Sequence, residues 1–346
     1  MRRGIDVAAA HRDMRVTILT YVEHAGEAPD VVVPQVEDAL RSKGHEVAVL
    51  PVHDELERFI GELRDHRPDL VFNLLEMFAD DLLLEVPAAG VYDLLHVPHT
   101  GGGPGEFYLA QDKALAKKLL AYEQILYPRF AVFPKHAGLE TGGNLRMPLF
   151  VKPLCADASI GIDSHALVHD ANELMRRVLK IHDEVNDAAL AEEYIEGREV
   201  YVGVIGNAEP IALPPIEVDF SGMPEGALHV LDRAAKWETE SAAYKGTKSV
   251  VAKLEPELEA RVKKVAVDAY RALRVRDYGR VDLRLAPTGE IYVIEVNPSC
   301  YLERSSELAM AAKAAGIEYE DLVQKIVDLA IERHHPRAKE RRRAGK

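Results

Sequence analysis

The sequence predicts an α/β protein of two or three domains. Its first part alternates strand-like and helix-like segments with short connections, at residues 15–20, 32–43, 46–50, 56–64 and 69–74. This alternation is typical of a parallel sheet covered by helices. A second observation is a strand–turn–strand pattern near the C-terminus, at 280–297. The third is the length of 346 residues, which exceeds what one small hydrophobic core organises.

Composition narrows the functional classes. The chain is 47% hydrophobic and 29% charged, with a net charge of −14. That charge disfavours general nucleic-acid binding, and no apolar run approaches the ~20 residues of a membrane helix. Cys155 and Cys300 are the only cysteines, which fits a reducing cytoplasm better than a disulfide framework. Residues 1–13 lack the apolar core of a signal peptide and are expected to form a flexible extension, and residues 336–346 a frayed basic tail.

The first strands predict where an N-terminal site would lie. Ligands bind beyond the carboxyl ends of parallel strands. Glu23, His24 and Glu27 follow the first strand, and Asn73 and Glu76 follow the third, so these polar residues are site candidates. The alternative is that they are ordinary loop residues on the surface.

A glycine-rich loop at 97–105 is interpreted as a turn and a domain boundary, because it lacks the lysine of a Walker phosphate loop. A helix is expected next, over 112–120. It carries Lys113, Lys117 and Lys118, but lysines on a helix are usually solvated, so the position of Lys113 alone is weak evidence for a function.

The middle of the chain points to a nucleotide. An apolar strand at 147–153 contains Lys152 near its end and leads into a loop of small residues that includes Ser159. A lysine there suits a phosphate as a compact charge, although a solvated lysine is the alternative. Residues 189–204 form a strand, a short linker and a second strand. Linker backbone flanked by Tyr194 and Ile195 is suited to a purine.

The hairpin at 280–297 predicts a metal site. Its strands bring Asp282, Glu295 and Asn297 close together, and these hard oxygen ligands suit Mg²⁺. Arg280 shares a face with Asp282 and supplies a fixed cation where negative charge develops. An ordinary acidic hairpin with surface charges is the alternative.

Five segments together resemble the ATP-grasp superfamily. DKALAKKLL, PLFVKPLCADASIG, EEYIEGREVYV, YGRVDLRL and YVIEVNPS follow its order and spacing, and the chain is most similar to D-alanine–D-alanine ligases and related carboxylate–amine ligases over about 14–334. The resemblance implies an ATP-grasp fold of three α/β domains with ATP between the last two. We expect an N-terminal domain at 14–111, a central ATP-grasp subdomain at 112–194 and a C-terminal subdomain at 195–335.

The resemblance also implies roles for single residues. Lys113 and Lys152 would contact the ATP phosphates, Glu192, Tyr194 and Ile195 would bind adenine, Glu199 would hold the ribose, and Lys236 would lie on the lid loop at 232–249. Asp282, Glu295 and Asn297 would bind two Mg²⁺ ions. Arg280 would stabilise the tetrahedral intermediate, and Ser159 and Lys236 are further catalytic candidates. Ser306 would hold the carboxylate of the second amino acid.

The substrate side departs from the family pattern. The glycine- and serine-rich signature after the first strand is absent, although Glu23 is available there to bind a substrate ammonium. Ala158 replaces a serine, Trp237 replaces the lid tyrosine, and Tyr301 stands where the family has a glycine. Arg304 is a candidate for binding a substrate carboxylate.

We therefore expect an ADP-forming, Mg²⁺-dependent carboxylate–amine ligase that acts through an acyl phosphate on substrates other than two D-alanines. The alternatives are a genuine D-alanine–D-alanine ligase, a nucleotide-binding regulator without turnover, and phosphoryl transfer without ligation. The expected partners are small molecules, with no nucleic acid or membrane, and the family is commonly homodimeric.

Overall fold

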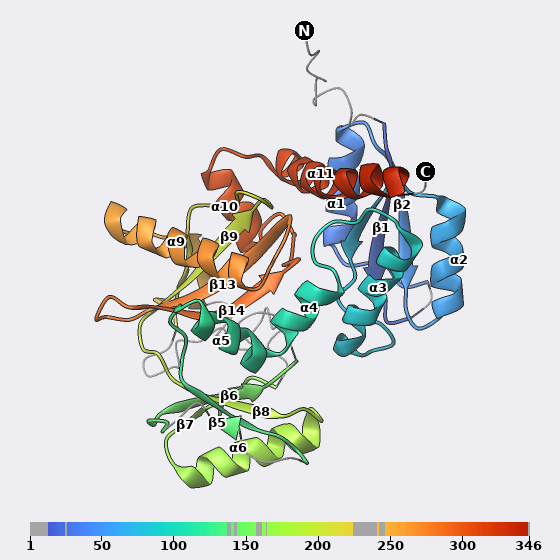
Figure 1. The fold of residues 1–346 in the computed structure, drawn as a ribbon. Coiled ribbons are helices and arrows are strands. Elements are labelled where there is room, and N and C mark those ends of the chain that lie inside the picture. Colours follow the sequence, from blue (N-terminus) through green and yellow to red (C-terminus); the bar gives the residue numbers. More distant parts are fainter. Residues whose placement is uncertain are drawn as a thin grey trace.

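The computed structural model describes residues 13–24, 26–136, 140–141, 144–156, 161–163, 165–223, 241 and 246–344. Three sheets organise these residues. In Figure 1, the sheet that carries α6 (Ala171–Glu184) lies apart from the N-terminal sheet, and α4 (Pro104–Gln111) and α5 (Lys113–Tyr122) run between the two.

The N-terminal sheet is parallel, in the order β2-β1-β3, as the alternating pattern predicts. Its strands are β1 (Arg15–Tyr21), β2 (Glu46–Val52) and β3 (Leu70–Leu74), and its helices are α1 (Val32–Ser42), α2 (Leu56–His66) and α3 (Glu85–Leu95). Helix α1 buries Val36, Ala39 and Leu40, which share the apolar face of the helix. The 3₁₀ turn η2 (Leu82–Leu84) and α3 were not expected.

The central sheet is antiparallel, in the order β5-β4-β8-β6-β7. Its strands are β4 (Phe130–Phe133), β5 (Glu140–Thr141), β6 (Leu149–Pro153), β7 (Leu167–Val168) and β8 (Ala189–Glu193), and α6 (Ala171–Glu184) packs against it. The connection from the N-terminal sheet is formed by α4 (Pro104–Gln111) and α5 (Lys113–Tyr122). The glycine-rich segment is thus only partly a loop, because α4 begins at Pro104, a residue favoured in the first helical turn.

The C-terminal sheet follows the order β12-β11-β9-β13-β14, with β10 on β9. Its strands are β9 (Arg198–Ile205), β10 (Ile211–Ala212), β11 (Ile216–Asp219), β12 (Lys248–Val251), β13 (Tyr278–Leu285) and β14 (Ile291–Pro298). Helix α9 (Pro256–Ala272) covers one face, where Val202, Val281 and Val293 are fully buried. The opposite face carries polar residues, among them Arg280, Asp282 and Glu295.

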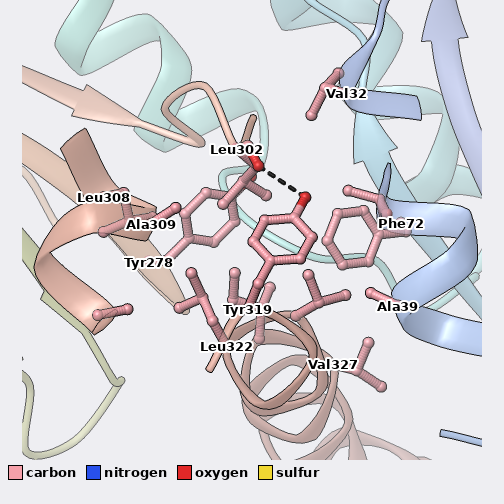
Figure 2. Close-up of a cluster of buried hydrophobic side chains, with 14 of the residues drawn as sticks. Val32, Ala39, Phe72, Tyr278, Leu302, Leu308, Ala309, Tyr319, Leu322 and Val327 are labelled. Atoms are coloured by element: carbon pink, nitrogen blue, oxygen red, sulfur yellow. Dashed lines mark hydrogen bonds between the residues drawn. The ribbon is translucent and has the colours of Figure 1, made fainter. Parts of the chain in front are cut away.

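The last two helices, α10 (Glu307–Ala314) and α11 (Tyr319–Ala344), join the C-terminal sheet to the N-terminal one. Figure 2 shows Tyr319 of α11 between Tyr278 of β13 and Phe72 of β3, with its hydroxyl donating to the Leu302 carbonyl at 2.8 Å. The expected frayed tail is wrong for the backbone of 336–344, which continues α11. No helix in the described part of the chain is long and apolar enough to cross a membrane.

Candidate active site

A cavity of about 960 Å³ is lined by residues from all three sheets and their connections. Val31 and Glu76 line it from the N-terminal part, Lys152 and Glu192 from the central sheet, and Asp282 and Glu295 from the C-terminal sheet. Residues far apart in the sequence therefore face one space large enough for a nucleotide and a small substrate.

A β-bulge sets which side chains of β14 face the cavity. Asp282 pairs with Glu295, but its neighbour Leu283 pairs with Val293, so Ile294 is the extra residue. Such an insertion reverses the side-chain alternation. Val293 is consequently buried against α9, whereas Glu295 and Asn297 line the cavity together with Asp282. The predicted closeness of these three residues is confirmed by the strand register.

Arg280 is held by two carboxylates and an aromatic ring. Its Nε and Nη2 donate to the two oxygens of Asp282 at 2.7 and 3.0 Å, and its Nη1 donates to Glu307 at 3.3 Å. The guanidinium carbon lies 4.8 Å from the centre of the Tyr201 ring. Burial lowers the pKa of Arg280, but Asp282 and Glu307 more than offset this, so the pKa is raised and the group stays charged.

Lys113 is buried, contrary to the expectation that lysines of this helix are solvated. Asp112 caps α5 by accepting from the backbone amides of Ala114 and Leu115, which fixes Lys113 at the first helical position. The Lys113 ammonium lies 3.2 Å from Glu295 and donates to the Ala156 carbonyl at 3.0 Å. A cation is thus placed between the hairpin and the start of the small-residue loop.

A second buried charge cluster consists of Lys117, Lys152 and Glu192. Glu192 Oε1 lies 2.6 Å from Lys117 Nζ, and Oε2 lies 3.1 Å from Lys152 Nζ. Burial alone would raise the pKa of Glu192, but the two lysines outweigh it and the pKa is lowered. Burial lowers the pKa of Lys117 despite the attraction of Glu192. Lys117 is a residue that sequence reasoning missed, although its spacing of four from Lys113 places both on one helix face.

The linker between β8 and β9 is fixed at both ends. The backbone amide of Tyr194 donates to the Pro148 carbonyl at 3.1 Å, and Tyr194 and Ile195 line the cavity. Gly197 has φ +139°, and a Cβ there would lie 2.0 Å from the Leu285 carbonyl oxygen, so only glycine fits. Glu199 accepts from Arg284 at 2.7 Å and from the Tyr201 hydroxyl, so its carboxylate faces the cavity with partners on both oxygens.

The connection from β14 to α10 borders the other end of the cavity. Tyr301 lines it and donates to Asp30 Oδ1, next to α1, at 2.7 Å. Ser306 also lines it, and its Oγ is buried without a hydrogen-bond partner in the part of the chain that the structure describes. A buried hydroxyl without a partner is costly, which marks Ser306 as a group that a ligand would satisfy.

Arg304 lies differently from the expectation. Its guanidinium donates to Glu320 at 2.7 Å and stacks 4.3 Å from the centre of the Tyr319 ring, and the residue is not part of the cavity lining. Glu307, which the sequence reasoning did not single out, lines the cavity instead. The structure therefore brings Tyr301, Ser306 and Glu307 to the cavity and turns Arg304 away from it.

The candidate site residues of the N-terminal part lie in different environments. Glu76 lines the cavity, whereas Glu23 is exposed and does not. Asn73 is buried and accepts from the Leu75 amide and the Tyr92 hydroxyl, so its role is structural and the expectation of a ligand contact is wrong. Ser159, Lys236, Ala158 and Trp237 lie outside the described residues.

The donor set of the hairpin fits a hard divalent cation. Asp282 and Glu295 supply carboxylates, and Asn297, which donates its Nδ2 to Asp282 at 3.2 Å, keeps its amide oxygen for a ligand. In the described part of the chain no three His, Cys, Asp or Glu residues cluster as a metal site, so a metal here would need the amide and non-protein oxygens. Mg²⁺ commonly binds in this way, through one or two carboxylates and substrate phosphates.

The comparisons with known proteins agree with this geometry. The model of the D-Ala–D-Ala ligase C-terminus matches residues 118–328. The uncharacterised protein y4sG of Sinorhizobium fredii is 33% identical over 310 residues, covering 88% of both chains. The D-alanine–D-alanine ligase of Pelotomaculum thermopropionicum is 30% identical over 308 residues, covering 86% of this chain and 90% of the relative.

Solved structures share the fold. The D-alanine–D-alanine ligase of Bacillus anthracis, crystallised in complex with ATP, gives a TM-score of 0.72 at 23% identity, over 94% of this chain and 99% of that chain. The VanG D-Ala:D-Ser ligase of Enterococcus faecalis gives 0.69 at 20% identity, over 92% and 100%. The predicted ATP-grasp fold is confirmed. With the sequence matches, the likeness shows that the chain belongs to the D-alanine–D-alanine ligase family of ADP-forming ATP-grasp ligases.

Proposed function

We propose that this ligase joins a carboxylate to an amine through an acyl phosphate, with Mg·ATP as phosphoryl donor. The observation that carries the proposal is that Lys113, Lys152, Arg280 and the Asp282–Glu295–Asn297 set line one cavity. A regulator without turnover would need neither the carboxylate–amide set nor the held arginine.

In the first step the donor carboxylate attacks the γ-phosphorus of ATP. A carboxylate O–P bond forms, the bond to the β-phosphate oxygen breaks, and ADP leaves. Lys113 and Lys152 would hold the phosphates, since both ammonium groups line the cavity from rigid elements. Asp282, Glu295 and Asn297 would hold Mg²⁺, which when bound offsets the charge of the transferring phosphoryl group.

In the second step the neutral amine attacks the acyl carbon. The C–N bond forms, the bond from carbon to the phosphate-bearing oxygen breaks, inorganic phosphate leaves, and the amine loses a proton. Arg280 would stabilise the oxyanion, because Asp282 and Tyr201 hold its guanidinium at the cavity wall. Ser159 and Lys236 remain proposals from the resemblance.

We further propose that the substrates are not two D-alanines. Tyr301 supports this. It stands at a position where the family pattern has a glycine, it lines the cavity, and its hydroxyl donates a hydrogen bond to Asp30. The alternative, a D-alanine–D-alanine ligase, is favoured by the names of the relatives. The homodimer and the domain boundaries at 111, 194 and 335 stay predictions.

The test is ADP release by the purified chain with Mg·ATP, screened against pools of D- and L-amino acids, other amines and small carboxylates. ADP that requires both an acid and an amine, with a new amide in the mass spectrum, supports the ligase. D-alanine alone sufficing would refute the changed substrate. Tight ATP binding without turnover on any pool would favour the regulator.

A further inference from the structure

The end of the cavity that Tyr301 and Ser306 border is the expected place of the amine acceptor, and it is acidic. We call it the acceptor end. Glu303, on the connection from β14 to α10, and Glu307, the first residue of α10, line this end, whereas the one basic residue of the connection, Arg304, is turned toward Glu320. Burial would raise the pKa of Glu303, but hydrogen bonds from Ser305 and Gln35 outweigh it and lower the pKa, so this carboxylate stays charged. Glu76 adds a further carboxylate from the N-terminal part.

Four cations of the described lining, Lys113, Lys152, Arg280 and Arg284, pair with carboxylates. Arg280 binds both oxygens of Asp282 and one of Glu307. The lining also includes three cations at the expected nucleotide side, which pair with acidic residues: Lys113 with Glu295, Lys152 with Glu192 and Arg284 with Glu199. Lys248 is exposed on β12, opposite Asp219 in the strand register. Among the described lining residues at this end, the carboxylates of Glu303 and Glu307 outnumber the one cation, Arg280, so an acceptor carboxylate would meet more negative than positive charge from them.

Glu307 has the capacity to bind a cation. Its Oε1 accepts from the Ser249 hydroxyl at 3.0 Å and its Oε2 from Arg280 at 3.3 Å, which fixes the carboxylate at the cavity wall. A carboxylate oxygen has two lone pairs, so each oxygen can accept one further hydrogen bond. The side chain is 22% exposed, so an ammonium of a ligand can reach it.

Ser306 provides a second, independent feature beside Glu307. Its Oγ is buried, has no hydrogen-bond partner among the described residues and belongs to a residue of the cavity lining. A hydroxyl accepts from an ammonium as readily as it donates to a carboxylate, and the adjacent charge decides between them. With Glu307 next to it, the adjacent charge is negative.

We propose that the acceptor is a cationic amine without a carboxylate, of the diamine class, whose second ammonium binds Glu307 and Ser306. This inference rests on the proposed ligase function and specifies its amine substrate. It sets this chain apart from a ligase that joins two amino acids, because there the second substrate carries a carboxylate at this end.

The test compares three acceptors with one skeleton and one donor: alanine with its carboxylate, alaninamide with a neutral amide, and propane-1,2-diamine with an ammonium in that place. We expect kcat/KM to be highest for the diamine and lowest for alanine. Glu307→Gln should raise the KM of the diamine at least about tenfold, leaving the KM of ATP within about twofold. Glu257→Gln, an exposed glutamate on α9, is the matched control and should change neither.

A binding measurement separates recognition from turnover. Calorimetry with propane-1,2-diamine and a non-hydrolysable ATP analogue should show binding to the native chain that Glu307→Gln weakens at least about tenfold. Preference for alanine, or an unchanged ranking of acceptors in Glu307→Gln, would overturn the proposal. An equal loss of kcat with every acceptor would also overturn it, since that result means Glu307 only holds Arg280. Absence of ADP release with every acid and amine would instead refute the ligase function, and this inference with it.

Discussion

Lys117→Met tests whether the buried cluster around Glu192 supports the fold and the nucleotide side of the cavity. The Lys117 ammonium is fully enclosed, 2.6 Å from Glu192 Oε1 and 3.1 Å from the Ile294 carbonyl. Methionine keeps an unbranched stem of similar length but removes the charge and the donor. The substitution therefore leaves Glu192 with one cation and the Ile294 carbonyl without this bond.

Removing one partner of a buried ion pair costs about 3–5 kcal/mol, because the remaining charge is uncompensated. Glu192 retains Lys152 at 3.1 Å, so the cost belongs at the lower end. Relief from burying the Lys117 ammonium, whose pKa is lowered by burial, acts in the opposite direction. We expect a loss of about 3 kcal/mol in the free energy of unfolding at neutral pH.

The assay is urea denaturation of the native chain, Lys117→Met and Lys118→Met, followed by circular dichroism. Lys118 is exposed on the same helix, so its replacement should change the unfolding free energy by less than about 0.5 kcal/mol. A double-mutant cycle with Glu192→Gln should give a coupling energy above about 1 kcal/mol. Equal stability of Lys117→Met and Lys118→Met would refute the reasoning.

Three other predictions concern charge. Burial, with Arg333 and Arg276 nearby, lowers the pKa of His99 from 6.5 to about 2, so the unfolded chain binds a proton below pH 6.5 that the native chain does not. The unfolding free energy should therefore fall by about 2 kcal/mol from pH 7 to pH 5, and His99→Gln should reduce this pH dependence in urea titrations. The same pH dependence in the native chain and in His99→Gln would contradict the prediction. Arg280→Lys should lower kcat about 100-fold while calorimetry shows little change in ATP affinity, because lysine loses the bidentate bond to Asp282; a native kcat would exclude the oxyanion role. Arg304→Ala should leave the KM of the acceptor within about twofold, since Arg304 faces Glu320; a large increase would restore it to the substrate site.

Local patterns predicted several of the elements but not helices such as α9, α10 and α11. The hairpin, the parallel N-terminal sheet and the strand–linker–strand at 189–204 follow from side-chain alternation and turn residues, which act over a few positions. Asp282, Glu295 and Asn297 came together for the same reason. The bulge at Ile294 was not foreseeable from alternation, because unbroken alternation would place Val293 on the same face as Glu295.

Contacts between residues far apart in the sequence determine the positions of site residues that local patterns did not predict. From the helix pattern alone, Lys117 is expected to be solvated. In the structure, β8 and β14 place Glu192 and the Ile294 carbonyl next to its ammonium. The direction of Arg304 depends on Glu320, which lies on α11 and beyond the loop that carries the arginine. The Glu307 carboxylate is held at the cavity by a hydrogen bond from Arg280, which lies 27 positions earlier in the chain.

The most direct test of the ligase chemistry uses a donor acid labelled with ¹⁸O in its carboxylate. Attack of that carboxylate on the γ-phosphate leaves one labelled oxygen between carbon and phosphorus, and amide formation releases it with the phosphate. Mass spectrometry should therefore find ADP, the amide and inorganic phosphate carrying one ¹⁸O. Amide formation with unlabelled phosphate, or with AMP in place of ADP, would contradict the acyl-phosphate mechanism.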